Sequence, residues 1–139
     1  MKKLILLVAI IPLLFSCSKK WHGCTDDVAT NFNINAEKQD DSCVYTRLTF
    51  YADSSQYPSS PVDHIDIQIG GTSLGTFATV YSIGGLINCG ANGTTSYIFE
   101  DAGGINWNAR VFLINGTVLT KTGSIAPDPN QTCILISTL

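Results

Sequence analysis

Hydrophobic and polar residues alternate through most of the C-terminal two thirds of the chain. In residues 62–69 isoleucines occupy alternate positions, and Asp66 and Gln68 lie between them. In residues 106–114 a similar apolar face begins at Trp107 and recurs at every second position. A period of two is typical of strands with one face buried. The segments that we expect to form strands are 46–52, 62–69, 72–81 (as one or two strands), 95–100, 106–114, 117–122 and 133–139.

Turn signals separate these segments. Eleven of the twelve glycines lie after residue 69, and Asn115-Gly116 is a strong signal for a two-residue hairpin. No segment shows a helical stripe. Short strands with turns every 8 to 12 residues or so predict a sandwich or barrel. We therefore predict an all-β fold for residues 45–139, a small antiparallel β-sandwich of about seven strands with an immunoglobulin-like or transthyretin-like layout.

The N-terminal segment has a different pattern. Two lysines precede an apolar run from Leu4 to Phe15, which is shorter than the roughly 20 residues needed to span a bilayer. It fits the apolar region of a secretory signal. The run ends in Ser16-Cys17, which resembles a bacterial lipobox. The alternative is an ordinary signal peptide with an incidental cysteine.

The lipobox resemblance implies that residues 1–16 are removed and that Cys17 carries acyl chains such as palmitate. Residues 17–22 would then form a tether to the membrane, and more than one acyl chain gives stable anchoring. We expect an exported protein, lipid-anchored in the bacterial cell envelope and specifically in the outer membrane. Without residues 1–16 the chain has six basic and eleven acidic side chains. This acidic balance disfavours nucleic acid as a partner.

Five cysteines are an odd number for an exported chain. Lipidation of Cys17 leaves four that can pair in an oxidising compartment. Three connectivities are open from sequence. We favour Cys24–Cys43 and Cys89–Cys133, because each pair closes within a segment of distinct composition.

The segment 23–43 is polar and acidic, and Asn31, Asn33 and Asn35 occupy alternate positions in it. We expect the disulfide and Phe32 to order it. Ca²⁺ prefers six to eight oxygen ligands, so a calcium site is one hypothesis. The alternative is a cluster of turns in which Asx side chains bond to their own backbone. The candidate ligands are Asp26, Asn31, Asn33, Asp40 and Asp41.

This segment resembles a short cysteine-bounded motif of exported bacterial and some eukaryotic surface proteins. The motif runs from GCTD to DDGSC, and the resemblance implies a compact disulfide-closed loop that binds calcium or serves as a spacer. Three positions depart from it: Asp27 replaces a proline, Gln39 an aspartate and Asp41 a glycine. The matching residues are Gly23, Cys24, Thr25, Asp26, Ala29, Asn31, Phe32, Asn33, Ala36, Asp40, Ser42 and Cys43.

The remainder resembles small sandwich domains of envelope lipoproteins, on the basis of Cys89-Gly90, Trp107 and Cys133. We identify no catalytic residues. His64 lies on the polar side of its predicted strand, and no nucleophile elbow is present. We expect a non-enzymatic binding or structural module with no certain cofactor. The alternatives are an adhesin module that binds a glycan or an envelope protein, and a small hydrolase.

Overall fold

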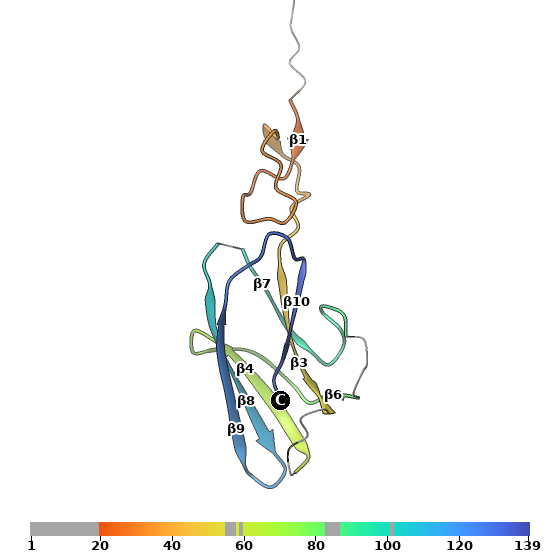
Figure 1. Ribbon diagram of the computed structural model, residues 1–139, viewed down its shortest axis with the longest axis vertical. Coiled ribbons are helices and arrows are strands. Elements are labelled where there is room, and N and C mark those ends of the chain that lie inside the picture. The colour runs from red at the N-terminus through yellow and green to blue at the C-terminus, as the bar shows by residue number, and fades with distance from the viewer. Residues whose placement is uncertain (1–19, 55–57, 59, 83–86, 101) are drawn as a thin grey trace, which may run out of the picture.

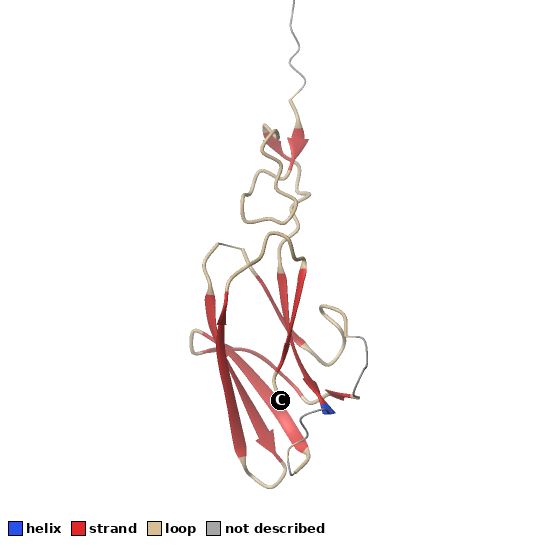
Figure 2. Cartoon of the chain, viewed as in Figure 1, coloured by secondary structure: helices blue, strands red, loops and turns tan. Residues whose placement is uncertain are grey.

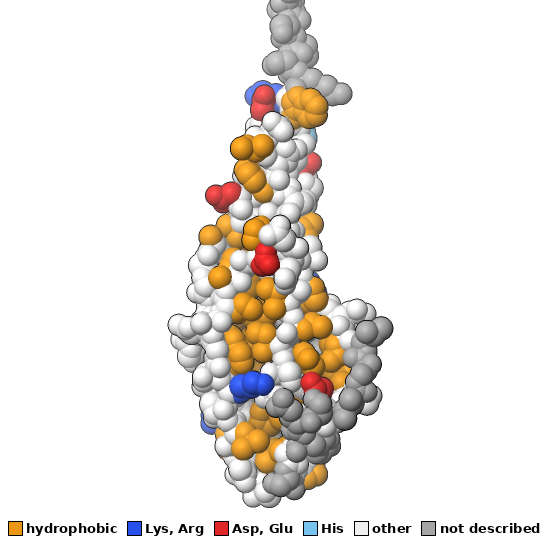
Figure 3. Space-filling model, viewed as in Figure 1, with side chains coloured by type: hydrophobic (Ala, Val, Ile, Leu, Met, Phe, Trp, Pro, Cys, Tyr) orange, Lys and Arg blue, Asp and Glu red, His pale blue; other side chains and the backbone are white. Residues whose placement is uncertain are grey.

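The computed structural model describes residues 20–54, 58, 60–82, 87–100 and 102–139. The molecule is elongated (Figure 3), with a disulfide-closed loop at one end and a β-sandwich at the other (Figure 1). Strands and loops make up nearly all of the described chain (Figure 2). The predicted fold class, an all-β sandwich preceded by an irregular disulfide-closed loop, is confirmed.

One layer of the sandwich is an antiparallel sheet in the order β5-β4-β8-β9. Gly116, with φ 83°, closes the hairpin between β8 and β9, as the Asn-Gly pair predicts. Strand β9 continues past the predicted end at residue 122. The four strands are β4 (Val62–Ile69), β5 (Thr72–Phe77), β8 (Ile105–Leu113) and β9 (Val118–Ile125).

The other layer is built around β3 (Arg47–Asp53). Strand β7 (Thr95–Ile98) pairs with it antiparallel, whereas β6 (Val80–Tyr81) and β10 (Cys133–Ser137) pair with it in parallel. Parallel pairing requires a long crossover, and β3 and β10 stand at opposite ends of the sandwich sequence. The sandwich is therefore of mixed pairing in this layer.

The core lies between the two sheets. Phe50 from β3 meets Trp107 from β8 edge to face, with ring centroids 5.4 Å apart. Fully burying a side chain of this kind contributes about 1.5–3 kcal/mol. The predicted inward faces of β4 and β8 are confirmed. The buried core residues are Leu48, Phe50, Ala52, Ile65, Ile67, Phe77, Phe99, Trp107, Ala109, Val111, Leu113 and Leu139.

Trp107 packs directly on the backbone of the neighbouring strand. Gly123 is its register partner on β9, and a Cβ at that position would lie 2.7 Å from Trp107 Cζ2. Only glycine leaves room for the indole there.

Two threonines of the core satisfy their hydroxyl groups internally. The Thr49 hydroxyl lies 2.9 Å from that of Ser96 and accepts the amide of Gly90 at 3.1 Å. The Thr46 hydroxyl is 2.9 Å from the carbonyl oxygens of both Asp128 and Gln131. These bonds meet the requirement that buried polar groups find partners.

The N-terminal loop carries two short parallel strands, β1 (His22–Gly23) and β2 (Lys38–Gln39). The prediction that Phe32 orders this loop is wrong, because its side chain is 43% exposed. Cys24 and Ala29 are buried instead. The disulfide and the Ala29 methyl group therefore occupy the interior of the loop.

Candidate functional site

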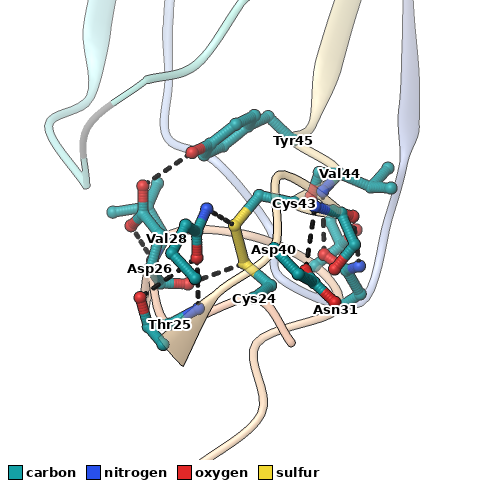
Figure 4. The surroundings of a disulfide bond; sticks show 12 residues. Cys24, Thr25, Asp26, Val28, Asn31, Asp40, Cys43, Val44 and Tyr45 are labelled. Carbon is teal, nitrogen blue, oxygen red and sulfur yellow. Dashed lines mark hydrogen bonds between the residues drawn. A yellow bond between two sulfur atoms is a disulfide. The ribbon is translucent and has the colours of Figure 1, made fainter. Parts of the chain in front are cut away.

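The disulfide between Cys24 and Cys43 closes the N-terminal loop, with Cα atoms 4.8 Å apart (Figure 4). Gln39 reinforces this closure from β2. Its Oε1 accepts the backbone amide of Thr25 at 2.8 Å and the Thr25 hydroxyl at 3.0 Å. Its Nε2 lies 2.9 Å from Cys43 Sγ. One side chain thus links both ends of the loop to the bridge.

Asp26 and Asn31, two of the predicted calcium ligands, hold the loop to the residues that follow it. Asp26 Oδ1 accepts the amide of Val28 at 3.0 Å and Oδ2 accepts the Tyr45 hydroxyl at 2.7 Å. Asn31 Oδ1 accepts the amide of Val44 at 2.8 Å, and Asn31 Nδ2 donates to the Ser42 carbonyl at 2.7 Å. Both side chains therefore serve as hydrogen-bonding partners of the backbone.

The other three predicted ligands lie at turns. Asn33 Oδ1 accepts the amide of Asn35 at 3.0 Å, and Asp40 Oδ1 accepts the amide of Ser42 at 3.1 Å. Asp41 has φ 61° and lies within the second of these turns. Bonds from a side chain to the backbone two residues on define the Asx turn.

The hydrogen bonds of these residues favour the Asx-turn alternative. No group of three or more His, Cys, Asp or Glu side chains suited to a metal ion occurs in the part of the chain that the structure describes. Side-chain oxygens of Asp26, Asn31 and Asp40 already accept hydrogen bonds from the loop or from Val44 just after it. The calcium site stays a hypothesis.

The same bonds shift the ionisation of the loop. Hydrogen bonds from the Tyr45 hydroxyl and the Val28 amide lower the pKa of Asp26. Hydrogen bonds from Ser42 lower the pKa of Asp40. Acceptance by Asp26, together with desolvation, raises the pKa of Tyr45. Each hydrogen bond therefore stabilises the protonation state that can form it, which is the carboxylate for Asp26 and Asp40 and the neutral hydroxyl for Tyr45.

The three departures from the cysteine-bounded motif have distinct environments. Gln39 forms the hydrogen bonds to Thr25 and Cys43 described above. Asp41 occupies the left-handed region in place of the glycine of the motif, a conformation that Asp tolerates better than most residues. Asp27 is exposed, one residue before the amide that Asp26 caps.

The second disulfide, between Cys89 and Cys133, has Cα atoms 5.7 Å apart. It attaches the loop after β6 to the first residue of β10. Both disulfides thus follow the favoured pairing. Cys17, the predicted lipidation site, lies outside the described residues.

A second candidate surface is the outward face of the β5-β4-β8-β9 sheet. His64, on the polar side of β4 as predicted, stacks on Phe112 with ring centroids 4.3 Å apart. Its Nδ1 lies 2.9 Å from Asp63 Oδ2. The Arg110 guanidinium lies 4.9 Å from the centre of the Phe112 ring. Asp66 accepts hydrogen bonds from neighbouring side chains on the same sheet.

Farther along this face lies a cavity of about 530 Å³, which was not predicted from the sequence. The strand register places Gln68, Asn108 and Thr122 side by side on β4, β8 and β9. The sequence feature that could have indicated this cavity is the pair of amide side chains, Asn106 and Asn108, at the two outward positions on either side of Trp107. The other lining residues are Gly70, Gly71, Asn106, Trp107, Gly123 and Ser124.

Comparison of the chain with protein-family models, with curated proteins and with solved structures finds no match in any of the three. Among the described residues, no helix has the length and apolar character needed to cross a membrane.

Proposed function

We propose that this chain is an exported lipoprotein that presents a non-catalytic β-sandwich at the bacterial cell envelope. The single observation that carries the proposal is the apolar run that ends at Ser16-Cys17. Acylation of Cys17 holds the chain in the outer membrane, and residues 17–22 form the tether.

The shape of the molecule supports this arrangement. The described chain starts at Lys20, at the end of the molecule that carries the disulfide loop (Figure 1). The hairpin between β8 and β9 lies at the opposite end. An anchor just before Lys20 would leave the disulfide loop as a spacer between the membrane and the sandwich. The disulfide stabilises this spacer because the cross-link lowers the entropy of the unfolded chain.

The environment of His64 supports a binding or structural role over hydrolysis. A hydrolase of the Ser-His-Asp type needs a histidine between an acid and a hydroxyl nucleophile. His64 contacts the acid next to it in the chain and stacks on Phe112. The stacking holds the imidazole nearly parallel to the Phe112 ring, and none of its contacts within the described residues is with a hydroxyl.

Metabolic labelling with an alkyne fatty acid tests the anchor in the full chain. We expect label on the wild-type protein and on Ser18→Ala, a control that changes the adjacent residue, and none on Cys17→Ala. The labelled forms should enter the detergent phase and co-sediment with the outer membrane. Label that persists on Cys17→Ala, or wild-type protein without label, would refute the proposal.

A further inference from the structure

The cavity on the outward face of β4, β8 and β9 has a neutral, hydrogen-bonding lining. It contains the amides of Gln68, Asn106 and Asn108 and the hydroxyl groups of Thr122 and Ser124. A primary amide offers donors and an acceptor side by side. Its volume of about 530 Å³ lies within the range typical of ligand sites.

The lining narrows the class of ligand. No lysine, arginine, aspartate or glutamate is among the residues that line it. Recognition of a phosphate, a sulfate or a carboxylate relies on cationic side chains or a helix N-terminus, and the lining of this cavity contains neither. The ligand that matches the lining is neutral and rich in hydroxyl groups.

Asn108 has an unmet bonding requirement. Its Oδ1 is buried and has no hydrogen-bond partner among the described residues. Leaving a buried acceptor unpaired is unfavourable, so a rotation of the Asn108 amide that brings Oδ1 to a ligand donor is favoured. The residue lies on the central strand of the cavity, between Gln68 and Thr122.

A peptide fits this site less well than a sugar. Extended peptides bind sheets by pairing with a free edge strand. Strand β8 is paired on both sides, with β4 and with β9, so its backbone offers no free ladder. Strand β9 is the edge strand of this sheet, whereas β4 and β8 contribute to the cavity through their side chains.

We propose that this cavity, here termed the amide groove and defined by Gln68, Asn106, Asn108, Thr122 and Ser124, binds a neutral oligosaccharide. This inference deepens the proposed function and rests on it, because an envelope-anchored module meets glycans at the cell surface. Vicinal hydroxyl groups of the sugar pair with the amides, and one of them donates to Asn108 Oδ1 after this amide has turned toward the groove.

Calorimetry on the full-length protein in detergent tests the inference. The probes are neutral hexasaccharides of glucose, mannose, xylose and N-acetylglucosamine, with a galacturonate hexamer as the anionic comparison. We expect at least one neutral hexamer to bind with a Kd below about 1 mM, and the anionic hexamer to bind more weakly. Binding of none of the neutral sugars, or of the galacturonate alone, would overturn the inference.

Two variants locate the site. Thr122→Arg places a long side chain in the groove from an exposed position and should weaken binding at least tenfold. Thr117→Arg makes the same substitution at an exposed position of the β8–β9 hairpin, outside the groove, and should leave Kd unchanged. Equal effects of both arginine variants would contradict the assignment.

Asn108→Ala separates a binding role from a structural one. It removes the unpaired acceptor, so we expect an unchanged or higher Tm together with binding at least tenfold weaker. A lower Tm with unchanged Kd would assign Asn108 to the fold and overturn its role in binding. Fatty-acid labelling of the same variants reports the anchor independently, so failure of the groove and failure of the lipoprotein proposal are distinguishable.

Discussion

The Tyr45 hydroxyl donates to Asp26 Oδ2 at 2.7 Å, and this bond joins the disulfide loop to the start of the sandwich. Two residues beyond Tyr45, β3 begins at Arg47. On the other side, Asp26 also caps the amide of Val28 inside the loop. One carboxylate therefore contacts both the backbone of the loop and the residue that leads into β3.

This pair predicts a pH dependence. Because the pKa of Asp26 is lowered in the folded state, its contribution is fully present above the ordinary aspartate pKa of about 3.9. It is lost as the pH falls below that value through the folded-state pKa. Because the pKa of Tyr45 is raised, its contribution is present below about pH 10 and is lost as the pH rises further.

Tyr45→Phe tests this relationship. NMR titration of the Asp26 carboxyl group should show its pKa moving up toward the ordinary value, because the largest cause of its shift is gone. Asp40 is the internal control, since its pKa depends on Ser42 and should not move. An unchanged Asp26 pKa in the variant would show that the bond does not form in solution.

Asp41→Gly should stabilise the loop. The left-handed conformation at Asp41, with φ 61°, costs a residue with a side chain roughly 1–2 kcal/mol, and less for aspartate. Allowing for the greater unfolded-state entropy of glycine, we expect a gain of about 0.5 kcal/mol in the free energy of unfolding. Asp27→Gly, at an exposed position of the same loop without positive φ, should be destabilising. Chemical denaturation of both variants compares them, and a loss for Asp41→Gly would contradict the expectation.

Gln39→Ala should loosen the disulfide loop. It removes the acceptor of the Thr25 amide and hydroxyl, and loss of such a bond costs about 1 kcal/mol. Hydrogen exchange at the Thr25 amide measures the effect directly and should accelerate. Gln39→Glu keeps an acceptor for Thr25 and should exchange more slowly than the alanine variant. Equal protection of the Thr25 amide in all three proteins would show that Gln39 does not form these hydrogen bonds.

The calcium hypothesis has a direct test in the oxidised protein. Because the oxygens of Asp26, Asn31 and Asp40 accept bonds within the loop, we expect Ca²⁺ and its removal by a chelator to leave Tm unchanged. Mg²⁺ at the same concentration controls for general ionic effects. A Tm that rises with Ca²⁺ alone and falls on chelation would establish a calcium site and overturn the Asx-turn interpretation.

Gly123→Ala should strain the sandwich. The added methyl group would lie 2.7 Å from Trp107 Cζ2, and overpacking of this kind typically costs about 1–3 kcal/mol. Gly104→Ala, one residue before β8, is the comparison, because a Cβ there lies no closer than 3.3 Å to its neighbours. Thermal denaturation should show a clear fall in Tm for Gly123→Ala and a smaller one for Gly104→Ala. Equal Tm values would mean that Trp107 can move aside.

The sequence predicts those features that depend on local pattern. Alternation identifies the buried faces of β4 and β8, because a period of two assigns each side chain to one face. It also predicts the hairpin at Asn115-Gly116. The contrast in composition between residues 23–43 and residues 45–139 is enough to favour the observed disulfides.

Other features depend on contacts that a local pattern does not encode. The parallel pairing of β10 with β3 arises from topology, and either direction leaves the same alternation. The burial of Cys24 and Ala29 in place of Phe32 depends on how the loop closes. The amide groove forms only when register aligns Gln68, Asn108 and Thr122 on three strands.

The pairing of β10 with β3 governs the order in which the sandwich can assemble. The Thr138 hydroxyl bonds to the Tyr51 carbonyl across 87 residues of chain, so the β3 layer lacks one edge until residue 138 has been made. Contacts of such long range slow folding. The sheet that contains the first strand of the sandwich is therefore the one that the last strand completes.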